Sequence, residues 1–293
     1  MPAVLRICGL TVGAFLLIFV ALAPAPASAA RDAGVAALQV ALQARGLYSG
    51  SIDGLAGPQT TLAVKRFQRR AGLAPDGRPG ARTRKALGRY GRHRLGSRLL
   101  ERGATGWDVA ALQFLLGWHG FPSGPIDGGL GVRTEGAVRR FQRWASLKPD
   151  GVAGPGTFAA LRRAPPRCPV ALAPPLAAPV EDPFGPRGNR FHAGLDFVAP
   201  AGTPVGAAAG GRVVFAGRAP GGWGKLVVVA HARGVRTLYA HLETVLVRVR
   251  QRVPAGARVG ADGSTRSATG PHLHFEVRLR GAAVDPRGCL AGR

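Results

Sequence analysis

A gapless internal duplication dominates the first half of this chain. Residues 35 to 87 recur at residues 109 to 161, and more than half of the aligned positions are identical. The matched segments are Val35–Gln39 with Val109–Gln113, Ile52–Gly54 with Ile126–Gly128, Arg66–Arg69 with Arg140–Arg143, and Pro75–Gly77 with Pro149–Gly151. A repeat of about 55 residues predicts two small and similar modules.

The spacing of apolar residues predicts three short helices in each copy. In the first copy, Leu38 and Leu42 lie four positions apart, and Gly46 follows as a helix stop. A third short helix is expected to end at Leu87. The second helix has its apolar face at Val64, Phe67 and Ala71. Each module is therefore expected to be a small helical unit with a groove between helices.

The repeats resemble the peptidoglycan-binding-domain-like modules of cell-wall hydrolases. The resemblance is carried by a V-x-x-L-Q opening, an I-D-G-x-x-G turn, an x-x-F-Q helix end and a P-D-G-x-x-G-x-x-T close, each present twice. It implies two three-helix modules, at 33–90 and 105–163, that bind peptidoglycan. Modules that bind nothing are the alternative. The shared residues Asp53, Gly54, Phe67 and Gln68 are expected to define turns and core, and they identify no ligand contact.

Residues 1–29 are predicted to be a secretory signal peptide. Arg6 precedes an apolar run from Ile7 to Leu22, and Ala27-Ser28-Ala29 forms a small-x-small cleavage site. A retained membrane anchor is the alternative, but the run is short for a span and lacks a basic flank. We expect an exported protein of the cell wall or extracellular space, or of the periplasm if the envelope has an outer membrane. The mature chain is expected to lack a transmembrane segment.

Two further features are expected to organise the second half of the chain. Seven prolines fall between residues 163 and 183, and they predict a semi-rigid, extended linker over 164–182. Cys168 and Cys289 remain after signal removal and are expected to pair in an oxidising compartment, with two free thiols as the alternative. Such a disulfide would contribute roughly 4 kcal/mol by the loop-entropy model.

The chain is strongly basic, with 40 Lys and Arg against 15 Asp and Glu and a net charge of +25. This charge favours polyanions, among them anionic cell-wall polymers. A biased composition rich in Ala, Gly, Pro and Arg explains the charge equally well, so it is weak evidence for a partner. The sequence contains no aromatic-rich basic element and no nucleic-acid motif, and we expect no nucleic-acid partner.

From about Val180 onward, short apolar runs separated by glycine predict a compact all-β domain. Within it, residues 270–277 read Gly-Pro-His-Leu-His-Phe-Glu-Val. Side chains alternate across a strand, so His272, His274 and Glu276 are expected to share one face. The opposite face, with Leu273, Phe275 and Val277, is expected to pack into the core.

Four histidines lie in distinctive contexts: His192-Ala-Gly-Leu-Asp196, Tyr239-Ala-His241-Leu242 and His272-Leu-His274. Together with Pro183-Phe-Gly-Pro-Arg187, Ala199-Pro-Ala-Gly-Thr-Pro204 and Val284-Asp-Pro286, they resemble the lysostaphin-type, LytM-like zinc metallopeptidases of bacterial cell walls. The resemblance covers roughly residues 180 to 288. It implies an all-β, duplicated-hybrid-motif-like peptidase domain at 183–290.

The resemblance also implies roles for individual residues. His192, Asp196 and His274 would ligate one Zn²⁺ per chain, while His241 and His272 would act on water and the substrate carbonyl. Tyr239 is a candidate auxiliary residue, although a packed strand tyrosine is an equal alternative. Of the remaining histidines, His231 is expected to be structural, and His93 and His119 are expected to face solvent. Neutral imidazoles are required, so metal affinity and activity are expected to fall together below about pH 6.

The leading hypothesis is an exported zinc endopeptidase that hydrolyses peptide bonds in peptidoglycan and is held on the wall by its repeats. The alternative is a non-catalytic wall-binding regulator that activates other hydrolases. A third possibility, a wall-binding protein with a structural zinc, is disfavoured because three protein ligands leave an open coordination position.

Overall fold

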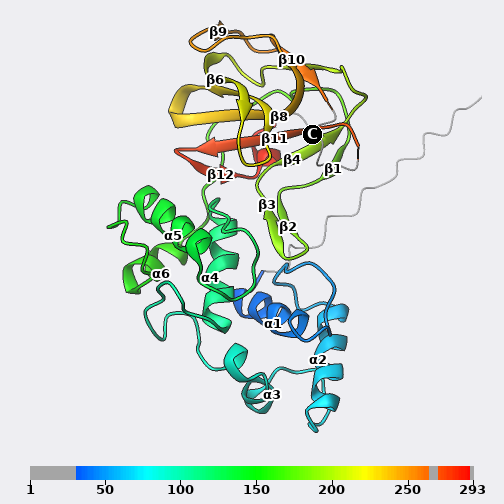
Figure 1. Cartoon of the computed structure of the whole chain (residues 1–293), viewed down its shortest axis with the longest axis vertical. Helices are drawn as coiled ribbons and strands as arrows, with labels where there is room; N and C mark the ends of the chain where they lie inside the picture. The colour runs from blue at the N-terminus through cyan, green and yellow to red at the C-terminus, as the bar shows by residue number, and fades with distance from the viewer. Residues whose placement is uncertain (1–30, 264–269, 291–293) are drawn as a thin grey trace, which may run out of the picture. The chain divides into compact units, whose positions relative to one another are not determined.

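The computed structural model describes residues 31–263 and 270–290 (Figure 1). The predicted signal peptide at 1–29 lies outside the described residues. Within the described part, no helix combines the length and apolar character that a membrane crossing needs. The described helices and strands all belong to one compact unit, Arg31–Arg293.

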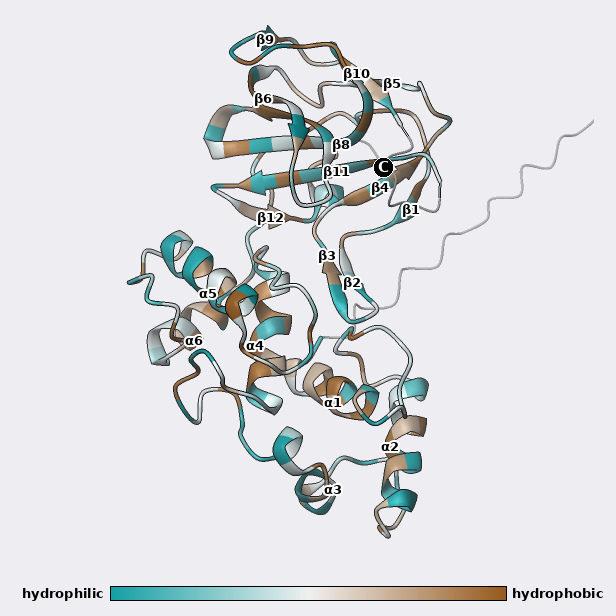
Figure 2. Ribbon diagram, viewed as in Figure 1, coloured by the Kyte–Doolittle hydropathy of each residue, from teal (hydrophilic) through white to brown (hydrophobic). Residues whose placement is uncertain are grey.

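Six α-helices, three in each repeat, confirm the predicted helical modules within the described residues. The first repeat ends with a short 3-10 helix, Gly88–Gly91. The six are α1 (Ala33–Gln43), α2 (Pro58–Arg70) and α3 (Ala81–Ala86) in the first repeat, and α4 (Trp107–Trp118), α5 (Val132–Trp144) and α6 (Pro155–Leu161) in the second. Figure 2 shows α1 largely in the colour of hydrophobic residues, because α1 packs against α4 between the two repeats.

One hydrogen-bond pattern explains the glutamine, Asp-Gly and threonine positions of the repeat. The buried Gln39 amide donates to Asp53 Oδ1 at 2.7 Å and to Thr60 Oγ1 at 3.1 Å, and its oxygen accepts from Gly54 N at 2.9 Å. Gly54 has a φ of 73°, which favours glycine. The same pattern recurs around Gln68, Gln113 and Gln142. These residues therefore satisfy buried polar groups, as the structural interpretation of the motif predicted.

The prediction for His119 was wrong. Its side chain is buried, with 2% exposed, and Nε2 lies 3.0 Å from the carbonyl oxygen of Leu161. The equivalent residue of the first repeat, Arg45, donates to Leu87 O at 2.7 Å, and Leu87 is the counterpart of Leu161. A different side chain therefore makes the same link to the end of the third helix. His93 is exposed as expected, and His231 bonds to Gly210 O and Thr237 Oγ1.

The second half of the chain forms the expected β-domain. Ten of its described strands belong to one sheet with the central order β1-β4-β11-β8-β7-β6-β9, and β2 and β3 form a separate hairpin. All pairings are antiparallel. The strands are β1 (Val180–Asp182), β2 (Gly185–Arg187), β3 (Arg190–His192), β4 (Leu195–Val198), β5 (Pro204–Gly206), β6 (Gly211–Ala219), β7 (Gly224–Ala230), β8 (Val235–Val245), β9 (Arg252–Val253), β10 (Arg258–Asp262), β11 (His272–Leu279) and β12 (Ala282–Val284). The alternation along β11 is confirmed, since Leu273, Phe275 and Val277 are fully buried in the core of this domain.

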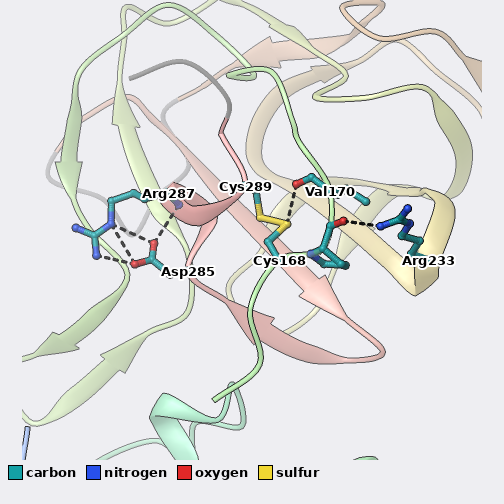
Figure 3. Close-up of a disulfide and its surroundings, with 7 residues drawn as sticks. Cys168, Val170, Arg233, Asp285, Arg287 and Cys289 are labelled. Atoms are coloured by element: carbon teal, nitrogen blue, oxygen red, sulfur yellow. Dashed lines mark hydrogen bonds and ion pairs between the residues drawn. A yellow bond between two sulfur atoms is a disulfide. The ribbon is translucent and has the colours of Figure 1, made fainter. Parts of the chain in front are cut away.

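The proline-rich segment is irregular, with bends at 170 and 175–177, and it packs against the β-domain, whereas the sequence had predicted an extended spacer. Leu172 and Leu176 are buried in the β-domain core, and Leu172 N donates to Cys289 O at 2.7 Å. A disulfide joins Cys168 to Cys289 with a Cα–Cα distance of 5.4 Å (Figure 3). Arg233 also donates to Pro169 O at 3.2 Å. Leucines placed between the prolines supply the apolar burial that a spacer lacks.

The β2–β3 hairpin touches both repeats at equivalent positions. Ile52 N donates to Gly188 O at 2.8 Å, and its counterpart Ile126 N donates to Asn189 O at 2.6 Å. At the base of the hairpin, Trp118 of α4 lies edge-on to Phe191, with ring centroids 5.1 Å apart. Figure 2 shows much of this hairpin in the colour of hydrophilic residues. The hairpin that ends at His192 is therefore held by the helical modules.

Candidate metal centre

Three side chains from neighbouring strands converge on one point of the β-domain. His192 ends β3, Asp196 lies in β4, and His274 lies in β11 directly opposite Asp196 in the strand register. Asp196 Oδ1 lies 2.7 Å from His274 Nδ1 and 3.1 Å from His192 Nε2. The two nitrogens are 3.0 Å apart, and one donor atom of each residue lies within 4.8 Å of the others.

The short connection between β3 and β4 depends on Gly194. A Cβ atom at this position would collide with the carbonyl oxygen of Phe275 in β11. Only glycine lets the backbone pass this close to the neighbouring strand. His192 and Asp196 can therefore approach His274 from a separate hairpin and an adjacent strand, as their spacing around a glycine suggested.

The imidazoles of His192 and His274 each have a hydrogen-bond acceptor on the side that faces away from the site. His192 Nδ1 lies 3.0 Å from Pro183 O, and a carbonyl can only accept, so Nδ1 carries the proton and Nε2 turns a lone pair to the site. His274 Nε2 lies 3.2 Å from Glu276 Oε1, which leaves Nδ1 for the site. Glu276 in turn accepts from Arg278 Nε at 2.7 Å. Outer carboxylate and carbonyl partners of this kind orient histidines that bind metals.

The charges within the site are strongly coupled. Burial alone would raise the pKa of the Asp196 carboxyl, but its bonds to His192 and His274 hold that pKa well below its ordinary value. For His274, burial acts to lower the pKa, and the hydrogen bonds to Asp196 and Glu276 outweigh it and raise the pKa to about 9. Asp196 is therefore an anion at neutral pH. Arg187 Nη1, 3.4 Å from Asp196 Oδ2, supports this charge from outside.

A bulge in β8 brings His241 to the same site. Between Tyr239 and Leu242, β8 advances three residues while β7 advances two, from Val227 to Lys225. His241 has a φ of 63°, so its side chain does not follow the strand's simple alternation. Its ring centroid lies 5.0 Å from that of His272 and 5.9 Å from that of His274.

The protonation states of the two outer histidines follow from their surroundings. Burial, followed by the positive charges of His274 and His272, lowers the pKa of His241 to about 4. His241 is therefore neutral at physiological pH. His272 Nδ1 lies 3.1 Å from Gly270 O, so Nδ1 carries the proton in the neutral ring and Nε2 can accept one.

Tyr239 lies apart from this chemistry. It is fully buried, and its hydroxyl accepts from Ala208 N at 2.8 Å and from Thr237 Oγ1 at 2.9 Å. These contacts describe a packed strand tyrosine, the alternative weighed from the sequence.

Trp223, which the sequence did not single out, lies against His274 with ring centroids 5.6 Å apart. Its glycine-rich context gives no signal of a site.

The three ligand atoms suit a metal ion that is intermediate between hard and soft, such as Zn²⁺. Once His274 has lost its proton, two imidazole nitrogens and one carboxylate oxygen match the ligands that catalytic zinc uses, and three protein ligands leave a fourth position for solvent. Two further imidazoles stand beside this set. Such an arrangement can combine a Lewis acid with proton transfer by histidine.

Sequence comparisons identify the same regions. The model of peptidase family M23 matches residues 190–286, and that of a peptidoglycan binding domain matches residues 31–87 and 105–161. The DD-carboxypeptidase/endopeptidase Mpg of Neisseria meningitidis is 45% identical over 113 residues, which cover 36% of this chain and 26% of that protein. The murein hydrolase activator NlpD of Salmonella dublin is 40% identical over 106 residues, which cover 36% of this chain and 27% of that protein.

Among solved structures, the catalytic domain of lysostaphin from Staphylococcus simulans is 34% identical to the matched part. The match covers 38% of this chain and 90% of that domain, with a TM-score of 0.36. The chain thus spans about a quarter of the length of the curated relatives named above. The shared region contains the strands that carry His192, Asp196, His241, His272 and His274.

Proposed function

This chain belongs to peptidase family M23, and we propose that it is a secreted zinc-dependent endopeptidase that hydrolyses peptide bonds in bacterial peptidoglycan. The observation that carries the proposal is the convergence of His192, Asp196 and His274 beside two further histidines. The two matches to the peptidoglycan binding domain, at residues 31–87 and 105–161, support wall binding by the part of the chain that precedes the peptidase region.

His192 Nε2, Asp196 Oδ1 and His274 Nδ1 would hold the zinc ion. When bound, zinc lowers the pKa of water and polarises the scissile carbonyl. Glu276 and Pro183 fix the two imidazoles in the required tautomers. Arg187 Nη1 pairs with Asp182 at 2.8 Å and also lies 3.4 Å from the second oxygen of Asp196, on the side away from the site.

His241 and His272 would carry the proton chemistry. His241 is neutral near pH 7 because burial lowers its pKa to about 4, so it can take a proton from the attacking water. The proton then passes to the leaving amine. His272, whose Nδ1 is held by Gly270 O, would donate to the developing oxyanion once it is protonated at Nε2.

The helical modules would keep the enzyme on its substrate. A linked binding site raises the effective concentration of substrate to as much as the millimolar range, so modest affinity suffices. The contacts of Ile52 and Ile126 with the β2–β3 hairpin connect both modules to the strand that ends at His192.

The proposal is tested by digesting purified walls that differ in crosslink type with the zinc-loaded protein. New amino termini, identified by mass spectrometry, are expected with the native protein and are expected to disappear with a chelator. The variant His241→Ala should retain zinc and release new amino termini about 10²- to 10⁴-fold more slowly. Release of reducing sugar ends without new amino termini would point to a different bond and contradict the proposal.

The similarity to a murein hydrolase activator favours a second candidate, a non-catalytic regulator. This function requires no metal and no neutral histidine. It predicts that the protein stimulates a separate wall hydrolase and that His241→Ala retains this stimulation. The complete set of five site residues favours the enzyme.

A further inference from the structure

A cationic hollow lies between the second module and the β-domain. It has a volume of about 420 Å³ and is formed by α5 and by the turn between β11 and β12. Arg140 and Arg143 of α5, Arg280 of the turn and the rings of Phe121 and Trp144 line it. The Arg280 guanidinium lies over the Trp144 ring, 5.9 Å from its centroid. It is separate from the histidine site and takes no part in the proposed hydrolysis.

The positive charges of this hollow are not compensated by carboxylates. Throughout the described part of the chain, no ion pair joins Arg140, Arg143 or Arg280 to an acidic side chain. Arg140 donates only weakly, to Pro122 O at 3.3 Å. Arg140 is exposed to solvent, and partial desolvation, followed by the charges of Arg278 and Arg143, lowers its pKa. Guanidinium groups gathered in this way are stabilised by a bound anion.

The β11–β12 turn is built to hold Arg280 in place. Arg280 and Gly281 have φ values of 51° and 96°, the signature of a tight two-residue hairpin turn. The following residue, Ala282, is fully buried in the core of the second module. Ala283 N also donates to Gly120 O at 3.1 Å. The backbone of the turn that carries the exposed Arg280 is therefore fixed against the second module.

The first module provides a comparison. Its residues Arg66 and Arg69 correspond to Arg140 and Arg143, but Arg70 stands in place of Trp144. A hollow in the first module is lined by Leu47 and Arg70, the counterparts of Phe121 and Trp144, but not by Arg66 or Arg69, and no residue of the β-domain lines it. Only the hollow at the second module therefore combines Trp144 with an arginine from the β-domain, among the residues that the structure describes.

We propose that this hollow binds a free carboxylate of a peptidoglycan stem peptide, an inference that rests on the proposed function. A carboxylate accepts two parallel hydrogen bonds from a guanidinium group. The half-buried ring of Trp144, packed beside the buried Phe121, offers contact to the methyl groups of neighbouring alanines in such a peptide. A phosphodiester polymer presents no comparable apolar groups, so it would leave the Trp144 ring unused.

The test measures binding of uncrosslinked muropeptides to the full chain by titration calorimetry. The two probes differ only in whether the glutamate carboxyl is free or amidated. We expect the native protein to bind the free form about tenfold more tightly. The double variant Arg140→Gln/Arg143→Gln should lose this preference, whereas the matched control Arg66→Gln/Arg69→Gln should keep it within twofold.

Thermal unfolding of both double variants separates loss of the site from loss of the fold. If the α5 variant does not fold, the exposed-turn variant Arg280→Gln is the second probe, with an expected loss of about threefold. Equal binding of both muropeptides by the native protein would overturn the proposal. So would a glycerol-phosphate oligomer that binds better than the free muropeptide and is sensitive to the α5 substitutions. Failure of the hydrolase proposal would instead appear as absence of new amino termini, with the binding preference intact.

Discussion

Removing the charge behind His274 should weaken metal binding without removing a metal ligand. Glu276 is buried, with 2% exposed, and its Oε1 lies 3.2 Å from His274 Nε2. In Glu276→Gln the side chain keeps its shape, but the carboxylate that orients the imidazole and increases its basicity is lost. Outer partners of this kind contribute about 10- to 100-fold in metal affinity. The expected loss is about 1.4–2.7 kcal/mol of binding free energy.

The same substitution also breaks the bond from Arg278 to Glu276 Oε2, at 2.7 Å. We therefore expect a destabilisation of about 1–3 kcal/mol in the free energy of unfolding. Metal affinity is measured above pH 9, where the proton of His274 no longer competes with the metal, by competition with a chromophoric chelator, and unfolding is measured in urea. Glu101→Gln, at an exposed position, is the matched control. A folded Glu276→Gln protein that binds zinc within twofold of the native affinity would refute this account of the site.

Three further predictions follow from the geometry. His274→Ala should abolish zinc binding, whereas His241→Ala should retain zinc and lower turnover about 10²- to 10⁴-fold; metal loss in the second variant, seen by elemental analysis, would reverse the assigned roles. His274, with a pKa of about 9, is protonated at pH 7 in the metal-free protein and must release that proton to bind metal. Zinc affinity measured by calorimetry should therefore rise about tenfold per pH unit from pH 7 and level off above about pH 9, and a flat profile over this range would count against the coupling. Cys289→Ser opens a disulfide that spans 121 residues and should cost about 4–5 kcal/mol by the loop-entropy model; a loss below 1 kcal/mol in urea unfolding would show that packing of the linker holds the end of the chain without it.

The pH prediction revises the expectation made from the sequence. An ordinary imidazole gives a loss of metal below about pH 6. The position of His274 between Asp196 and Glu276 moves the proton competition to a higher pH range. A sequence does not show which carboxylates will surround a histidine, so the size of this effect required the structure.

The parts of the fold that follow from local chemistry could be predicted. The helices of both repeats follow from apolar spacing and glycine stops, and the two faces of β11 follow from strand alternation. His241 is different. Simple alternation would place it on the core face with Tyr239, and only the bulge with a φ of 63° turns it to the site. The family resemblance identified His241 as a site residue. The alternation of side chains along a strand could not have identified it.

The structure differs from the sequence-based prediction at two other places, and both differences arise from tertiary packing. His119 was expected in solvent because Arg45 occupies the equivalent position, yet both side chains reach the carbonyl at the end of the third helix. Burial of an imidazole there depends on packing against Phe141, with ring centroids 5.3 Å apart. The proline-rich segment was expected to be a spacer because composition predicts stiffness. Its docking depends on where Leu172 meets the β-domain.

The central claim is that five side chains form one zinc-dependent hydrolytic site. It is tested most directly by treating purified peptidoglycan with zinc-loaded protein, chelated protein and the His241→Ala variant, and then sequencing the released peptides by mass spectrometry. New peptide amino termini should appear at the full rate only with the zinc-loaded native protein. Equal release by the chelated protein or by His241→Ala would contradict the account.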